Sequence, residues 1–219
     1  MNKEKIATLT TWIEKNSLSG AILTDYHSVA YLSGFESDPI ERVLALVLLS
    51  GHEPFLFGPA LEVNSMKESG WQYSAFGYAD QENPWQKLVS HIKKATPGTS
   101  FAIEADNLTV SRFQALQSAY PSASFNSDIT DQINQQRLIK TSTEIQRMIA
   151  AGHDADRAFE IGFHALHEGI SELAVAAQIE YELKKSGVPS MSFETLVQFG
   201  DHAADPHGST SNRQLQSGD

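Results

Sequence analysis

The chain has 219 residues, a net charge of −11 and no cysteine. The acidic balance and the lack of a basic block argue against binding to nucleic acid. The missing cysteines exclude disulfides, thiolate metal sites and a cysteine nucleophile. Hydrophobic residues make up 41% of the chain, a share typical of a folded globular protein.

No segment of the sequence has the character of a membrane or export signal. Residues 1–16, MNKEKIATLTTWIEKN, lack the continuous apolar core of a signal peptide. The longest apolar run, residues 43–49, is far shorter than the roughly 18 residues of a membrane helix. We therefore expect a cytoplasmic protein without a membrane partner.

Short helices and strands are predicted to alternate through residues 1–125. Helices are expected at residues 2–16 and 27–32, from Asn83 onward, and at 109–120. Strands are expected at residues 20–24, 71–78 and 101–104, with a hairpin formed by 43–49 and 54–57. This alternation predicts an α/β domain with a central sheet.

The composition changes near residues 126–140, where Asn, Asp and Gln dominate. We place the domain junction here and divide the chain into residues 1–130 and 131–219. Thr141 and Glu144 have the spacing of a capping box, which predicts the start of a long helix ending near Gly169. Ser171 is expected to cap a second helix.

Residues 191–199 alternate between two faces, which predicts a strand, and a polar loop follows at Gly200. One strand and two helices cannot bury their own apolar faces or pair their own edges. The second part therefore reads as an incomplete fold, and we expect exposed apolar surface on residues 137–219.

His207 is the strongest candidate for chemistry. Pro206 fixes one backbone dihedral beside it, and Gly208 places no side chain next to the imidazole. A neutral histidine held in this way can donate a hydrogen bond to a substrate or exchange a proton with it. The alternative is a histidine with a purely structural role in the turn.

Other polar clusters favour simpler interpretations. His164 and His167 share a helix face, but their spacing differs from that of the H-E-x-x-H zinc motif, and histidines near a helix C-terminus are favoured by the dipole. His153, Asp154 and Asp156 are expected on a solvated helix face. No G-x-S-x-G elbow, Walker loop or G-x-G-x-x-G motif is present.

Several motifs together resemble the bacterial Xaa-Pro dipeptidases (prolidases) and aminopeptidases P of the pita-bread metallopeptidases. In the first part these are Tyr31-Leu-Ser-Gly-Phe35, Asp38-Pro-Ile-Glu-Arg42, Pro54-Phe-Leu-Phe57, Pro59-Ala-Leu-Glu-Val63 and Glu82-Asn-Pro-Trp85. In the second they are Arg137-Leu-Ile-Lys140, Ser192-Phe-Glu-Thr195 and Pro206-His-Gly208. The resemblance extends over essentially the whole chain.

The resemblance implies a creatinase-like N-terminal α/β domain followed by an incomplete pita-bread (α+β) domain. It implies hydrolysis of dipeptides with C-terminal proline by water bound to two divalent metal ions, Mn²⁺ or Co²⁺, in a homodimer. It also implies a catalytic and substrate-binding role for His207 and substrate-binding roles for Asp38 and Arg42. No residue of this chain matches a metal ligand of the family, so we expect it to bind neither ion.

One residue departs from the family pattern. Ile40 stands where related dipeptidases have histidine, in a loop that the resemblance places near the partner subunit's active site. The missing imidazole is expected to alter substrate selectivity or its dependence on pH.

Two functional interpretations remain open. The chain is the first part of a dipeptidase, inactive alone because the metal ligands are missing, or it is a non-catalytic truncated paralogue that acts as a dimerisation or peptide-binding module. Creatinase, a metal-free relative, is a weaker third candidate, because the motifs of the first part are those of prolidases.

Overall fold

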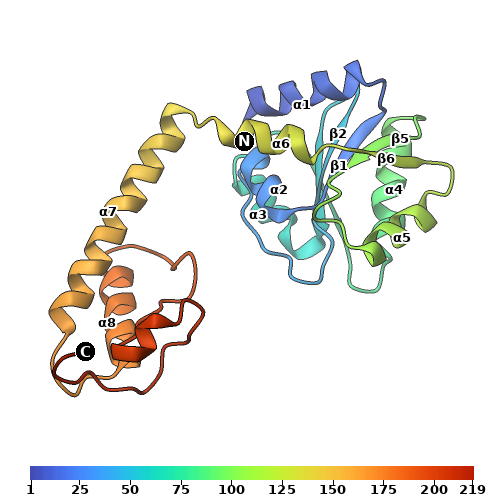
Figure 1. Ribbon diagram of the computed structural model, residues 1–219. Coiled ribbons are helices and arrows are strands. Elements are labelled where there is room, and N and C mark those ends of the chain that lie inside the picture. The colour runs from blue at the N-terminus through green and yellow to red at the C-terminus, as the bar shows by residue number, and fades with distance from the viewer. The chain divides into compact units, whose positions relative to one another are not determined.

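The computed structural model describes all 219 residues, and they form two compact units, Met1–Ile139 and Lys140–Asp219 (Figure 1). The first unit is an α/β domain built on a central sheet. The second contains two helices and a long polar loop. Each unit has its own hydrophobic core.

The sheet of the first unit has six strands in the order β4-β3-β2-β1-β5-β6. Their bounds are β1 Gly20–Leu23, β2 Ala45–Leu49, β3 Phe55–Pro59, β4 Ser74–Tyr78, β5 Ser100–Ile103 and β6 Ser124–Asp128. Strands β1, β2 and β3 pair antiparallel, whereas the pairs β3–β4, β1–β5 and β5–β6 are parallel. The central strands β1, β2 and β3 are buried throughout, as expected for a sheet covered on both faces. The predicted hairpin is thus confirmed as β2 and β3.

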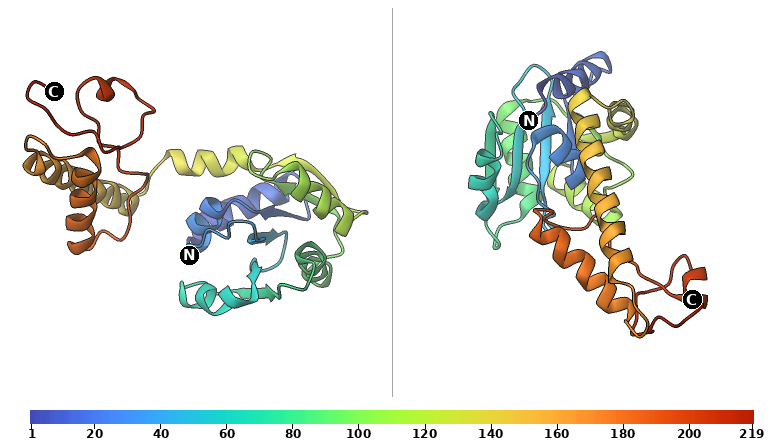
Figure 2. Two further views of the ribbon diagram at one scale, coloured as in Figure 1. Left: turned by 90° about the horizontal axis from the view of Figure 1, so that it is seen from below. Right: turned by 90° about the vertical axis from the view of Figure 1, so that its left-hand side faces the viewer.

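Helices cover both faces of this sheet (Figure 2). On one face lie α1 Lys3–Lys15, α2 Tyr26–Ser33, α3 Val63–Glu68 and α6 Thr130–Leu138, and the short 3₁₀ helix η1 Ala60–Glu62 precedes α3. On the other face lie α4 Pro84–Ala95 and α5 Val110–Ala119. Successive residues of β1 enter different cores, because side chains alternate across a strand: Leu23 packs with the first group and Ile22 with the second.

Local sequence signals account for most helix ends in this unit. The side chain of Asn83 accepts a hydrogen bond from the N–H of Gln86, and Pro84 is the first residue of α4. Gly34 ends α2 with a φ of 82°, in the left-handed region that glycine adopts at little cost.

The polar stretch at residues 126–136 belongs to the first unit. It forms the end of β6 and most of α6, with Ile129 and Ile133 buried against the core. The division we placed at residues 130/131 therefore falls at the start of α6, and the first unit extends to Ile139. The few apolar residues of this stretch are spaced four apart, which is enough to attach a helix to the sheet.

The second unit contains α7 Ser142–Ala165, α8 Glu172–Lys185 and the 3₁₀ helix η2 Gly200–Ala204. The capping box is confirmed, because the side chains of Thr141 and Glu144 each accept a hydrogen bond from the other's backbone N–H. Ser171 caps α8 as predicted. A Cβ at Gly162 would lie 3.0 Å from Ile179, so the glycine permits close packing of α7 on α8.

The predicted strand at residues 191–199 is wrong. The structure has no regular strand there, because no neighbouring strand offers a backbone ladder. The hydroxyl of Thr210 instead accepts the N–H of Val197 at 3.0 Å and donates to the carbonyl of Thr195 at 3.1 Å. A side chain thus replaces part of the missing strand pairing.

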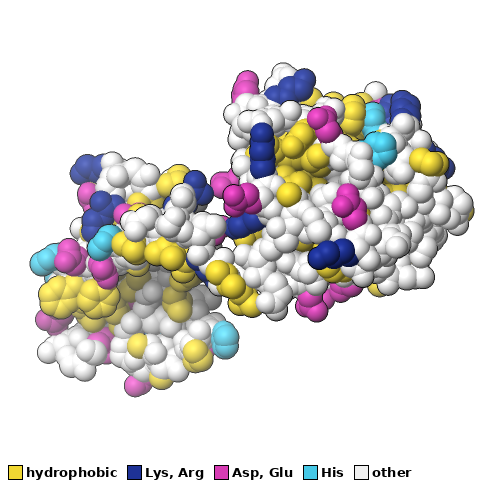
Figure 3. All heavy atoms as spheres, turned by 90° about the horizontal axis from the view of Figure 1, so that it is seen from above, with side chains coloured by type: hydrophobic (Ala, Val, Ile, Leu, Met, Phe, Trp, Pro, Cys, Tyr) yellow, Lys and Arg dark blue, Asp and Glu magenta, His cyan; other side chains and the backbone are white.

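Large apolar side chains are exposed on the second unit, as predicted (Figure 3). They include Ile145, Met148, Ile149, Phe159, Phe163, Leu166, Leu173, Tyr181, Phe193 and Leu196. The buried core of this unit is small and consists of Ala165, Val175 and Phe199 with partly buried neighbours. None of the helices combines the length and the apolar character that crossing a bilayer requires.

Candidate functional site

Glu172, the first residue of α8, holds the polar loop of the second unit together. Its side chain is fully buried and accepts hydrogen bonds from the backbone N–H groups of Phe199 and Ser211, both at 2.9 Å. The Ser211 hydroxyl donates to it at 2.7 Å, and His202 Nδ1 lies 2.9 Å from Oε1. One carboxylate therefore closes the loop formed by residues 199–211.

These contacts determine the charge of Glu172. Burial acts to raise its pKa, but the hydrogen bonds from His202, Ser211 and Phe199 outweigh burial and lower the pKa to about 2. The carboxylate is consequently ionised at neutral pH. Because an ionised carboxylate only accepts hydrogen bonds, His202 Nδ1 is the donor in this contact.

His207 lies inside the loop that Glu172 closes. Its backbone N–H donates to Asp205 Oδ1 at 3.0 Å, and the N–H of Gly208 donates to the Asp205 carbonyl at 3.3 Å. The first of these bonds forms an Asx-type turn, which fixes the backbone beside Pro206. The side chain of His207 is exposed, and its imidazole makes no hydrogen bond within the chain. The turn thus presents a free imidazole.

The space beside Gly208 differs from our expectation. A Cβ at this position would lie 2.0 Å from Gln198 Nε2, so the glycine makes room for the Gln198 amide rather than for open space beside the imidazole. Gln198 Nε2 is buried and has no hydrogen-bond partner. A buried donor without a partner is uncommon, and here it lies next to the His207 turn.

Asp38 and Arg42 lie in one loop of the first unit, between α2 and β2, whereas His207 belongs to the second unit. Asp38 Oδ1 accepts the N–H of Ile40 at 2.9 Å, so this carboxylate shapes the loop. Arg42 Nη1 pairs with Asp80 Oδ1 at 3.0 Å. Asp38 and Arg42 therefore belong to the same loop, and each already has an interaction partner within the first unit.

The backbone of this loop is strained at Ile40. Its φ is 55°, in the left-handed region that β-branched residues rarely adopt, and its side chain is 80% exposed. Arg112 of α5 holds the strained segment, because its Nη2 lies 3.1–3.4 Å from the carbonyl oxygens of Ile40, Glu41 and Arg42. Nothing in the sequence pointed to Arg112, since more than 70 residues separate it from Ile40 and Glu41.

The residues of this chain do not fit a two-metal centre. No three His, Cys, Asp or Glu side chains are grouped in a way that could hold a metal ion. His164 and His167 are exposed, and His167 Nδ1 lies 3.1 Å from the carbonyl oxygen of Glu168. Asp154 pairs with Arg157 at 2.9 Å on the exposed face of α7.

Two family descriptions match the chain, one for each unit. Residues 5–139 match the Creatinase/Prolidase N-terminal domain, and residues 146–219 match Metallopeptidase family M24. The chain belongs to the creatinase/prolidase family. Its fold is a creatinase-like N-terminal α/β domain followed by part of a pita-bread domain, as the resemblance implied.

Relatives in this family match one or both units of the chain. The chain is 41% identical over 218 residues to the Xaa-Pro dipeptidase of Lactobacillus delbrueckii subsp. lactis. The match covers 99% of this chain and 58% of that protein. It is similar to the structure of the N-terminal domain of Xaa-Pro dipeptidase from Lactobacillus brevis, with 41% identity and a TM-score of 0.57 over 60% of this chain and 98% of that one.

A third comparison extends over both units. The Xaa-Pro dipeptidase from Bacillus anthracis matches with 25% identity and a TM-score of 0.84, covering 99% of this chain and 58% of that one. The chain thus spans about 58% of the length of its curated prolidase relatives.

Proposed function

We propose that these 219 residues form the N-terminal domain and the beginning of the catalytic domain of an Xaa-Pro dipeptidase, which cleaves dipeptides with C-terminal proline. The 41% identity to relatives of that name supports the proposal. The structural observation that carries it is the loop closed by Glu172, which presents the free imidazole of His207 on a fixed turn.

In this proposal His207 is the catalytic and substrate-binding residue of the chain. Its imidazole donates a hydrogen bond to the dipeptide or exchanges a proton with it, while Glu172 keeps the loop from rearranging. Asp38 and Arg42 are proposed to bind substrate at the active site of the partner subunit in a homodimer, with Arg42 leaving Asp80 for the substrate carboxylate.

Two divalent ions, Mn²⁺ or Co²⁺, are proposed to supply activated water in the whole enzyme. The side chains of this chain do not form such a site. We therefore expect the 219-residue polypeptide alone to release no proline from Leu-Pro, even with Mn²⁺. We propose a cytoplasmic location. We also propose no nucleic-acid partner, since the chain carries a net charge of −11.

The second candidate is a non-catalytic dimerisation or peptide-binding module. The absence of a metal-binding group and the exposed apolar face of α7 favour it. In that case the turn at His207 binds peptide without cleaving it.

A chimera separates the two candidates. Residues 1–219 are joined to the unmatched remainder of the Lactobacillus delbrueckii enzyme, loaded with Mn²⁺ and assayed with Leu-Pro and Leu-Ala. The dipeptidase proposal expects proline release, with a strong preference for Leu-Pro. A folded, metal-loaded and dimeric chimera that cleaves neither dipeptide, or both equally, contradicts it.

A further inference from the structure

A polar pocket lies in the first unit where three parallel strands end. The carboxyl ends of β1, β5 and β6 meet at one edge of the sheet, because β5 pairs parallel with both neighbours. The helix after β1 packs on one face of the sheet and the helix after β5 on the other. Such a reversal between neighbouring parallel strands opens a crevice, the usual place of ligand sites in open α/β sheets.

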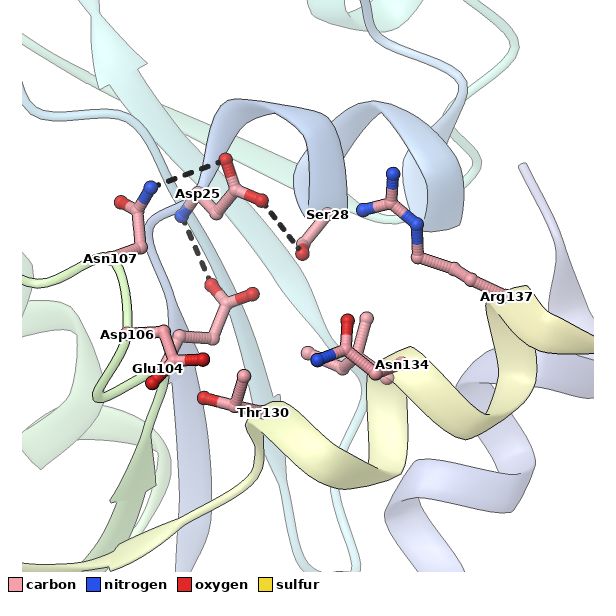
Figure 4. A pocket seen from close by; sticks show the side chains of 9 residues that line it. Asp25, Ser28, Glu104, Asp106, Asn107, Thr130, Asn134 and Arg137 are labelled. Atoms are coloured by element: carbon pink, nitrogen blue, oxygen red, sulfur yellow. Dashed lines mark hydrogen bonds between the residues drawn. The ribbon is translucent and has the colours of Figure 1, made fainter.

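The carboxylates of Asp25, Glu104 and Asp106 line this pocket near the strand ends. Glu104 directly follows β5 and is only 4% exposed, and Asp25 caps α2 shortly after β1. Glu104 Oε2 accepts the backbone N–H groups of Thr24 at 2.8 Å and Asp25 at 3.0 Å. Figure 4 shows the other oxygen of Glu104 turned into the pocket.

Ser28 bridges the carboxylates of Asp25 and Glu104. Asp25 Oδ1 also accepts hydrogen bonds from the N–H of His27 at 3.2 Å and from Asn107 Nδ2 at 3.4 Å. Ser28 is the side-chain donor that reaches Glu104, yet its hydroxyl has one proton and also donates to Asp25 Oδ2 at 3.2 Å. Burial raises the pKa of Glu104, and the negative charge of Asp25 raises it further. A cationic group placed between Asp25 and Glu104 would reduce the repulsion between their charges.

The opposite wall of the pocket is one face of α6. Four residues with helical spacing line the pocket from this side: Thr130, Ile133, Asn134 and Arg137. Arg137 lies there on α6, with its guanidinium 5.8 Å from the centre of the Tyr31 ring (Figure 4). The pocket therefore has negative charge on the side of the strands and a positive charge on the side of α6.

The size of the pocket limits the ligand. Its volume is about 170 Å³, whereas pockets for drug-sized ligands measure about 300–1,000 Å³. A dipeptide or nucleotide is too large, and no three acidic or histidine side chains are arranged for a metal ion. A small zwitterion fits both the charges and the volume.

We propose that this pocket binds a free α-amino acid, with its ammonium group between Asp25 and Glu104 and its carboxylate at Arg137. The side chain of the amino acid then faces Ile133, the apolar residue of the lining. This site goes beyond the proposed peptidase function, since it uses only residues of the first unit.

Calorimetric titration of the 219-residue chain tests this site with L-alanine, ethylamine and propionate as probes. We expect one alanine per chain with a dissociation constant below about 10 mM, and binding of the other two at least about tenfold weaker, since each lacks one charge. Glu104→Gln and Arg137→Gln are each expected to weaken alanine binding at least about tenfold. The matched control, Glu53→Gln on the exposed hairpin turn, should bind as the unmodified chain does.

Arg137 is exposed, so its variant is expected to fold even if the Glu104 variant does not. Three results would overturn the proposal: no saturable alanine binding up to about 10 mM, equal affinity in the Arg137→Gln variant, or propionate or ethylamine binding as tightly as alanine. Activity of the chimera does not enter this test, so the two proposals can fail independently.

Discussion

His202 Nδ1 lies 2.9 Å from Glu172 Oε1, across 30 residues of chain. This contact joins η2 to the first turn of α8. Phe199 and Ser211 donate further hydrogen bonds to the same carboxylate. The turn at His207 lies between these attachment points and has no regular secondary structure to hold it. Its geometry therefore depends on Glu172.

Replacing Glu172 tests this dependence. Glu172→Gln removes the negative charge and replaces one acceptor oxygen with an NH₂ group. This donor would then face the N–H and O–H donors that now bind the carboxylate. We expect a loss of local stability of about 2 kcal/mol, the usual cost of buried polar groups left unpaired. Hydrogen exchange should show faster exchange across residues 197–213. Glu168 is an exposed residue just before α8, and Glu168→Gln should leave the exchange rates of residues 197–213 unchanged. Equal exchange in both variants would contradict the role of Glu172.

The acid response of this loop follows from the pKa of Glu172. A folded-state pKa of about 2, below the ordinary value of 4.5, means that the ionised carboxylate stabilises the fold fully above about pH 4.5. This contribution decreases as the pH falls toward 2. We expect the amide resonances of Phe199 and Ser211 to titrate in that window and not in Glu172→Gln. Resonances that stay constant down to pH 2 would show that the carboxylate does not control the loop.

Ile40 stores strain that substitution should release. Ile40→Asn places a residue that tolerates positive φ at an exposed site, and we expect a gain of about 1 kcal/mol in the stability of the first unit. All three tryptophans of the chain lie in this unit, so urea unfolding followed by their fluorescence measures it. Leu61→Asn is the matched control, because Leu61 is similarly exposed but its φ is not positive. An equal effect of the two substitutions would argue against strain at Ile40.

Ile40 is also expected to influence selectivity. In the chimera, Ile40→His introduces an imidazole beside Asp38 and Arg42, which should change KM for Leu-Pro and the pH profile of kcat/KM between about pH 5 and 8. Leu61→His provides the matched exposed control. Unchanged kinetics and an unchanged pH profile in Ile40→His would mean that this loop does not reach the substrate.

Sequence reasoning succeeded where the signal was local. Asn83 with Pro84, and Thr141 with Glu144, marked helix starts that the structure confirms, because a cap is made by residues three positions apart. The hairpin of β2 and β3 was recognisable from its apolar runs and its turn. The mixed sheet order, with β5 inserted beside β1, has no local signature.

The errors and omissions concern contacts over long distances in the chain. The alternation at residues 191–199 indicated a strand, but a strand needs a neighbour, and Thr210 supplies only a hydroxyl. Glu172 resembled an ordinary acidic residue in the first turn of a helix, since its partners are 27 to 39 residues away. Pro206 and Gly208 indicated a turn at His207, whereas no local signal indicated that Glu172 holds its loop.

The proposed function requires that His207 contacts the substrate, and the kinetics of His207→Gln in the chimera test this contact. We expect kcat/KM for Leu-Pro to fall by about 10²-fold or more, the usual contribution of a positioned acid or base. His167→Gln, an exposed histidine elsewhere in the same unit, should retain full activity with the same metal content. A His207→Gln chimera that cleaves Leu-Pro as fast as the His167→Gln control would show that His207 does not act on the substrate.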